Sequence, residues 1–273
     1  MNFRTALLAV SILSFAFAGC TEDEAAAAPD SAAESSALTT MSAALQAELD
    51  ALDMAVGSAR QIVQDAGLDS ADAVAALAPL LEAHASVLRA CIVGPDGTLL
   101  GGTTKAGAGC PIGEPASAHP DKMESHRGVD HHLSEVHSEG EHPNVALLKQ
   151  PIVSAGGNHL GSLSVLFDPY LLLEPVIREN TPGGDLHFVV GQTNGHLLHD
   201  PEPGKVHKNV KEHSDFADFA ELQAVVVKVA AAQEGTTEFG YFDQQKQEQV
   251  LWRVYWNTIK LHGQQWRVVL QAR

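Results

Sequence analysis

Histidines and carboxylates gather in one segment of the chain, residues 119–142. Six of the 14 histidines of the protein lie there, interleaved with aspartates and glutamates. Neutral imidazole nitrogens and carboxylate oxygens are donors that Zn²⁺, Cu²⁺, Ni²⁺ and Fe²⁺ accept in proteins. The composition of the segment therefore indicates a site for a divalent transition metal, with zinc, copper or nickel as the candidate ions.

The candidate ligands follow from the spacing within this segment. If residues 129–138 are helical, His131 and Glu135 share one face at spacing i, i+4. The full candidate set is His126, Asp130, His131, Glu135 and His137. No HExxH, CxxC or CxxCH motif occurs in the segment, so a solvated acidic loop that binds metal weakly is the alternative. A third hypothesis is pH sensing, because histidines among carboxylates gain charge between about pH 5 and 7.

A second group of candidate site residues lies on a strand predicted near the C-terminus. Alternation along this strand places Arg253 and Tyr255 on one face, and it places two tryptophans on the other. An arginine beside a tyrosine in a concave surface can hold a carboxylate ligand. The candidate ligand contacts are Arg253, Tyr255, Lys149 and His187. The alternative is that Trp252 and Trp256 fill the core while Arg253 extends to solvent.

The motifs of common enzyme classes do not occur in this sequence. His199 and Asp200 are adjacent, but they precede Pro201 at the end of a predicted hairpin and are typical of a turn. No serine, cysteine or threonine lies in a nucleophile-elbow context, and there is no P-loop or GxGxxG motif. We therefore predict that the protein is not an enzyme.

The overall composition is that of a folded, acidic protein. The chain has 273 residues, 45% of them hydrophobic, which suffices for one large domain or two small ones. It carries 17 basic against 34 acidic residues, a formal net charge of −17. This balance argues against nucleic-acid binding, because there is no surplus of lysine and arginine to neutralise phosphates.

Residues 1–19 have the pattern of a signal peptide. Arg4 precedes an apolar run that is too short to span a bilayer and that ends in small residues. The ending Phe17-Ala18-Gly19-Cys20 resembles a bacterial lipobox, which implies a lipid on Cys20 and a position in the cell envelope facing the periplasm. Plain secretion to the periplasm is the alternative, because Ala16-Phe17-Ala18 also fits the small-x-small cleavage rule. The small and acidic residues 20–37 predict a flexible tether behind this anchor.

The three cysteines support export of the chain. If Cys20 carries a lipid, two cysteines remain, and an exported protein can pair them. We therefore predict a disulfide between Cys91 and Cys110.

The folded body begins with a long helix. Apolar residues recur at spacings of three and four from Leu38 to Val63, which is one face of a helix. Asp69 or Ser70 can cap a second helix behind it.

Two similar sets of strands follow the helices. Each set opens with a hairpin whose turn is an Asx-Gly pair, at Asp96-Gly97 and at Asn194-Gly195. Helices are predicted over residues 169–180 and 216–232. The sequence thus predicts an α+β fold, with a long N-terminal helix followed by two antiparallel-sheet units.

At these residues the chain resembles a double-Cache domain, the extracytoplasmic PAS-like sensor module of bacterial chemoreceptors and sensor kinases. The resemblance rests on the long helix and on three segments, which are residues 93–99, residues 150–168 and residues 190–201 with 263–269. It implies a first unit over residues 38–182, interrupted by the histidine-rich segment, and a second unit over residues 183–273. It also implies small-molecule sensing in a pocket on one face of a PAS-like sheet.

The sequence leaves two main hypotheses of function and, as a third, a purely structural protein of the cell envelope. In the first, a lipid-anchored sensor binds a small ligand and passes the signal to a membrane partner. In the second, a periplasmic lipoprotein binds a divalent metal through residues 119–142. The pattern of the amino-acid-binding Cache subgroup is missing from the first unit, so we do not predict an amino acid as the ligand.

Overall fold

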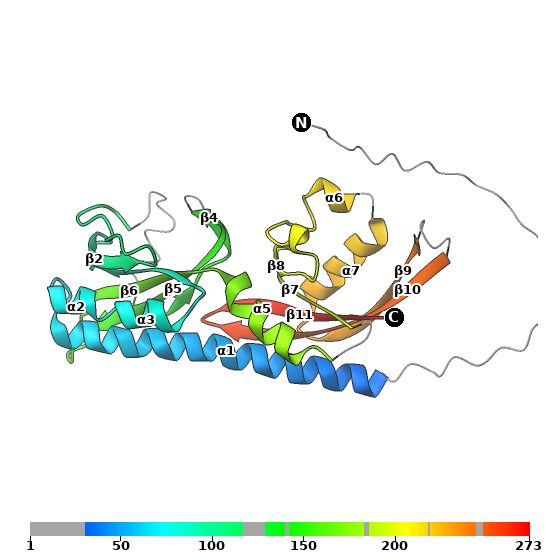
Figure 1. Ribbon diagram of the computed structural model, residues 1–273, viewed down its shortest axis with the longest axis horizontal. Coiled ribbons are helices and arrows are strands. Elements are labelled where there is room, and N and C mark those ends of the chain that lie inside the picture. Colours follow the sequence, from blue (N-terminus) through cyan, green and yellow to red (C-terminus); the bar gives the residue numbers. More distant parts are fainter. Residues whose placement is uncertain (1–30, 117–128, 140–141, 183–185, 218, 244–247) are drawn as a thin grey trace, which may run out of the picture. The chain divides into compact units, whose positions relative to one another are not determined.

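The computed structural model describes residues 31–116, 129–139, 142–182, 186–217, 219–243 and 248–273. It combines one long helix with two antiparallel sheets (Figure 1). The predicted α+β class and the predicted pair of sheet-based units are confirmed. In the part of the chain that the structure describes, no helix has the length and apolar character needed to cross a membrane.

Helix α1 (Ser31–Ala66) turns one apolar face to the interior, as the spacing predicts. Its largest buried residues are Leu38, Met41, Leu45, Leu49, Leu52, Val56 and Val63. The helix begins before Leu38, so the prediction that the tether extends to residue 37 is wrong. The physical reason is Glu34, which is buried and forms an ion pair with Arg253, so this acidic residue belongs to the folded body.

The first unit is built on a sheet with the strand order β2-β1-β6-β5-β3, in which β4 also pairs with β5. Its strands are β1 (Val87–Val93), β2 (Leu99–Thr104), β3 (His132–Leu133), β4 (His137–Glu139), β5 (His142–Val153) and β6 (His159–Phe167). Two short helices, α2 (Ala71–Ala75) and α3 (Ala78–Ala83), connect α1 to this sheet. The side chain of Ser70 caps α2, as one of the two predicted caps.

The predicted disulfide between Cys91 and Cys110 is present and joins β1 to the loop behind β2. The two Cα atoms lie 6.3 Å apart. Gly102 lies against this bridge, and a Cβ atom there would come within 2.5 Å of Cys110 Sγ. The position therefore requires glycine.

Helix α5 (Pro169–Asn180) leads from the first sheet to the second, and the Asp168 side chain caps its N-terminus. The second sheet has the order β8-β7-β11-β10-β9. Its strands are β7 (His187–Gln192), β8 (Leu197–His199), β9 (Gly235–Asp243), β10 (Glu248–Leu261) and β11 (Gln264–Ala272). A 3-10 turn, η1 (Pro203–Lys205), and helices α6 (Ser214–Ala217) and α7 (Ala220–Ala231) lie between β8 and β9. The continuous helix predicted over 216–232 is wrong, because Phe219 has a non-helical backbone conformation.

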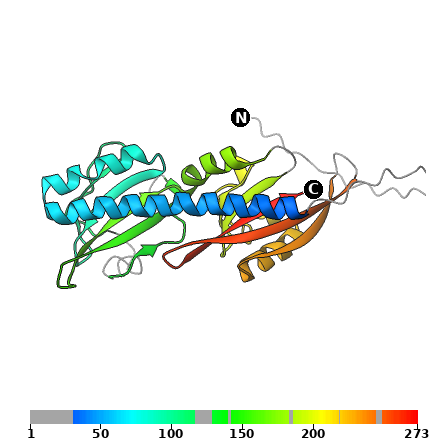
Figure 2. The ribbon, with the colours of Figure 1, turned by 90° about the horizontal axis from the view of Figure 1, so that it is seen from below.

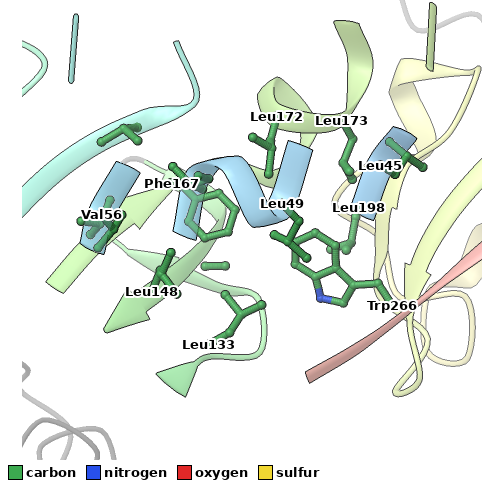
Figure 3. Close-up of a cluster of buried hydrophobic side chains, with 14 of the residues drawn as sticks. Leu45, Leu49, Val56, Leu133, Leu148, Phe167, Leu172, Leu173, Leu198 and Trp266 are labelled. Carbon is green, nitrogen blue, oxygen red and sulfur yellow. The ribbon is translucent and has the colours of Figure 1, made fainter. Parts of the chain in front are cut away.

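One hydrophobic core joins α1 to both sheets. Trp266 of β11 lies beside Leu49 of α1, while Phe167 and Leu148 of the first sheet pack further along the same helix (Figure 3). The view in Figure 2 shows α1 passing across both sheets. A separate hydrophobic cluster lies between the second sheet and α6 and α7. This second cluster surrounds the candidate site.

Candidate functional site

A cavity of about 680 Å³ lies in the second unit, between its sheet and helices α6 and α7. Its apolar wall consists of Val189, Leu197, Val210, Phe216, Phe219, Leu222, Val225, Val226, Val229, Phe239, Trp252, Val254 and Val269. Protein sites for small molecules usually measure 300–1,000 Å³ and are mostly apolar. The cavity has the size and the lining of such a site.

Apolar residues at helical spacing on α7 and at strand spacing on β10 form this wall. Val225 and Val229 stand one turn apart on α7 and are buried towards the sheet. Trp252 and Val254 alternate along β10 and line the cavity from the opposite side. The cavity therefore lies where the apolar face of a helix meets the apolar face of a strand without filling the space between them.

Arg267 supplies a buried guanidinium at the cavity wall, with only 4% of the residue exposed. Its Nε donates to the carbonyl of Val229 at 2.9 Å, and its Nη2 donates to that of Ala230 at 3.2 Å. Its Nη1 donates to Thr258 Oγ1 at 2.9 Å. Burial lowers the pKa of Arg267. These bonds tie the C-terminal end of α7 to β11, so Arg267 holds the helix over the cavity.

His187 and Arg273 line the cavity and flank the Trp252 ring. The His187 ring meets Trp252 edge-on, with the ring centroids 5.2 Å apart. The guanidinium of Arg273 lies 4.6 Å from the centroid of the Trp252 ring, a cation–π arrangement. Asp200 also lines the cavity, and its burial raises the pKa of its carboxyl group. Gln192, Glu202, Lys205, Glu221 and Gln271 line the cavity as well, so a bound molecule would meet charged and amide groups besides the apolar wall.

The structure separates the residues that the sequence grouped as ligand contacts. His187 lines the cavity, whereas Arg253 and Tyr255 are not among its lining residues. Arg253 Nη2 instead donates to Glu34 Oε1 of α1 at 2.5 Å. The side chains of β10 alternate between the two faces of the sheet as predicted. The carboxylate that pairs with Arg253, however, belongs to Glu34 of this chain and not to a ligand. The structure therefore shows Arg253 neither in the cavity nor extended into solvent. Its side chain is paired with Glu34.

Comparisons with known proteins find a matching family model and solved structures of similar fold. The family model "HK/GC/Chemotaxis protein-like, sensor domain" matches residues 47–169. The structure is similar to an extracellular ligand binding receptor from Desulfohalobium retbaense, with a TM-score of 0.64 and 21% identity. That alignment covers 87% of this chain and 39% of the receptor, so the chain spans well under half of its length. No curated protein matches the sequence.

Chemoreceptor domains of similar length align over nearly their whole chains. The periplasmic sensory domain of the Campylobacter jejuni chemoreceptor Tlp1 has a TM-score of 0.60 and 10% identity, with 88% of this chain and 94% of that chain covered. The ligand-binding domain of the Pseudomonas fluorescens chemoreceptor CtaA, solved with L-serine, has a TM-score of 0.61 and 16% identity, with 87% and 94% covered. The fold is that of a double-Cache sensor domain.

Lys149 lies in the first Cache unit, away from the cavity of the second. Its position on β5 leaves 1% of the residue exposed. Burial lowers the pKa of the Lys149 ammonium, and the nearby Asp130 carboxylate opposes this effect. Lys149 therefore does not belong to the same site as His187.

Residues 129–138 are not helical, so the expected i, i+4 pairing of His131 with Glu135 does not occur. Strands β3 and β4 of this segment pair with β5 of the first Cache unit. Leu133 and Val136 are buried, and the sheet edge supplies partners for the backbone that a helix would have satisfied internally. His126 lies outside the described residues.

His137 and His131 lie in different surroundings. The Nε2 atom of His137 is 3.4 Å from Glu139 Oε2, and Arg89 also pairs with Glu139. His131 instead lies beside Asp53 and His262. Sequence reasoning missed Asp53 and His262 because they come from α1 and from the turn between β10 and β11, and no local pattern joins them to His131.

Glu139→Gln should destabilise the protein by about 1 kcal/mol at pH 7, since the side chain is 35% exposed and solvent screens its interactions. The hydrogen bond with His137 and the charge of Arg89 lower the pKa of Glu139 from 4.5 to about 2, against the effect of burial. A carboxyl group whose pKa is lower in the folded state stabilises above its unfolded pKa and loses this contribution as the pH falls.

The measurement is urea unfolding of wild type and Glu139→Gln between pH 7 and pH 3. The difference in the free energy of unfolding should shrink below about pH 4.5. Glu135→Gln, at an exposed position nearby, is the matched control and should change stability little at any pH. A constant difference across the range would show that Glu139 stabilises through packing rather than charge.

Proposed function

We propose that the chain is an extracytoplasmic sensor that binds a small, largely apolar organic molecule in the cavity of its second Cache unit. The cavity itself carries this proposal, since its walls are mainly valine, leucine and aromatic side chains, with polar and charged groups among them. The relatives point to ligand binding in general, since several were solved as chemoreceptor domains with bound amino acids. Binding alone, without chemical conversion, is the role proposed for the cavity.

We further propose that the chain acts at the bacterial cell envelope. The signal-peptide pattern of residues 1–19 and the lipobox-like ending at Cys20 support export and a lipid anchor facing the periplasm. The disulfide between Cys91 and Cys110 fits an oxidising compartment. In this arrangement the ligand signal passes to a membrane signalling protein, and helix α1 is the element nearest the anchor in sequence.

The second Cache unit is attached to α1 through the strand that lines the cavity. On one face of β10, Trp252 and Val254 border the cavity. From the same strand, Arg253 pairs with Glu34 of α1. Further along, the backbone N–H and carbonyl of Lys260 bond to the Gln46 side chain at 2.8 and 3.0 Å. A ligand that moves β10 would therefore shift contacts along α1, which is how a population shift could reach the membrane.

A thermal-shift screen tests the ligand class. Chelator-treated protein is mixed with apolar organic acids, aromatic compounds, amines and amino acids. A ligand at 100 times its Kd should add about 2.7 kcal/mol of stability, or roughly 5–10 °C in Tm. Stabilisation by amino acids alone would contradict an apolar ligand.

Val225→Phe tests the position of the site. The larger side chain extends from α7 into the cavity and should weaken binding of any stabilising compound by at least about 10-fold, because the ligand and the ring compete for one volume. Val227→Phe is the matched control, since Val227 lies on the same helix with 62% of the residue exposed. Unchanged affinity in Val225→Phe would place the ligand elsewhere, even if the chain is a sensor.

A further inference from the structure

Three side chains from distant parts of the chain meet outside the cavity. Asp53 lies on α1, His131 lies just before β3 of the first Cache unit, and His262 lies in the β10–β11 turn of the second. One oxygen or nitrogen donor atom from each residue lies within 4.8 Å of the others. The Nε2 atom of His262 is 2.8 Å from Asp53 Oδ1, and the rings of His131 and His262 have their centroids 4.8 Å apart.

We propose that Asp53, His131 and His262 form a binding site for a divalent transition-metal ion such as Zn²⁺ or Ni²⁺. Two imidazoles and one carboxylate are a donor set that such ions take, with water in the open coordination positions. The site is independent of the cavity and of the ligand proposed for it. Unlike the set expected from the histidine-rich segment, it contains one residue of that segment and two from elsewhere.

The neighbours of Asp53 hold its carboxylate in place. Gln150 of β5 donates from Nε2 to Asp53 Oδ1 at 2.7 Å and to the Asp53 backbone carbonyl at 2.8 Å. Gln150 is itself buried, so its amide has a fixed position. An outer hydrogen bond of this kind orients a metal-binding carboxylate.

The charged groups around the site have opposite effects on the pKa of His131. Burial, together with His262, Arg60 and Lys149, lowers the pKa of His131, while Asp53 raises it. The positive charges of Arg60 and Lys149 repel a cation, so the affinity should be lower than in sites with several carboxylates or thiolates.

The backbone at His262 gives separate support. His262 has φ +45° and is followed by Gly263 with φ +88°, so both central residues of the hairpin turn are left-handed. Such turns favour Asn-Gly, and a histidine there is uncommon. The turn aims the imidazole at α1, where it meets Asp53. A metal ion at this point would connect α1 with both Cache units.

Metal titration of the full-length, chelator-treated protein tests the site. Isothermal titration calorimetry with ZnCl₂ and with NiCl₂ should show one strongest site. Mg²⁺ and Ca²⁺ should not occupy it, because these ions prefer oxygen ligands. His262→Asn and Asp53→Asn should each weaken the strongest site by more than the 10–100-fold typical of losing an outer-sphere partner.

His207→Asn is the matched control for His262→Asn. His207 also has a left-handed backbone, with φ +75°, but it lies outside the three-residue group. This variant should keep the full affinity. His131→Asn changes an exposed side chain and tests the site even if a substitution at Asp53 or His262 prevents folding. Unchanged affinity in His131→Asn and His262→Asn would overturn the proposal and indicate weak binding by other histidines.

Discussion

Trp266→Ala should lower the free energy of unfolding by about 3–5 kcal/mol. Only 1% of Trp266 is exposed, and its ring lies beside Leu49 and Leu198 (Figure 3). Alanine would leave a large cavity where α1 meets the second Cache unit. Because this core also continues into the first sheet, we expect the loss to affect the whole body and not one unit alone.

Trp266→Phe separates the volume of the ring from its polar atom. The indole Nε1–H of Trp266 has no hydrogen-bond partner among the described residues. Phenylalanine keeps much of the apolar contact and removes this buried donor, so we expect a cost of about 1–2 kcal/mol.

Urea unfolding followed by circular dichroism measures both Trp266 variants. A single transition with an alanine cost well above the phenylalanine cost is the expected result. If alanine and phenylalanine cost the same, the ring volume is not what stabilises this junction. Two separate transitions in the wild type would contradict a shared core.

The elements with strong periodicity could be predicted from the sequence. The apolar face of α1 and the helix beginning at Pro169 appear in the structure as expected, because each depends on neighbours within a few residues. The disulfide could be predicted because only one pairing remains once Cys20 is set aside. The fold class could be predicted from the order in which these helix and strand patterns follow one another along the chain.

The sites depend on contacts that no local pattern contains. Residues 132–133 and 137–139 form short strands because β5 accepts them as partners, and that pairing cannot be read from the spacing within the segment. The cavity exists because α7 and β10 do not fill the space between them, which is a matter of packed volume. The group of Asp53, His131 and His262 joins three elements only through tertiary structure.

Glu34→Gln should lower the free energy of unfolding by about 3 kcal/mol. The side chains of Arg253 and Glu34 are 13% and 10% exposed, so removing one charge leaves the other buried without its partner. Breaking a buried ion pair in this way costs about 3–5 kcal/mol, and we expect the lower end because some solvent reaches both groups. Arg253 Nη2 also donates to the backbone carbonyl of Arg273 at 3.2 Å, which limits the loss further.

The double variant Glu34→Leu/Arg253→Leu tests whether the charge or the packing matters. Two apolar side chains leave no unpaired charge, so the double variant should be more stable than the sum of the two single leucine variants predicts. Additive costs in this double-mutant cycle would show that the pair contributes little by direct interaction. Burial and a hydrogen bond with Glu34 raise the pKa of the Tyr255 phenol. Removing the Glu34 carboxylate should therefore lower the pKa of Tyr255.

Hydrogen exchange connects this pair to the proposed signal. Arg253 lies outside the cavity, so Arg253→Leu should leave the affinity for a cavity ligand nearly unchanged. In the wild type, a ligand that moves β10 should change amide protection in the first turns of α1, because Glu34 attaches those turns to the strand. In Arg253→Leu this response should be lost while binding persists. A ligand response of α1 that survives the substitution would mean that the signal reaches the helix through Gln46 and Lys260 or through the core instead.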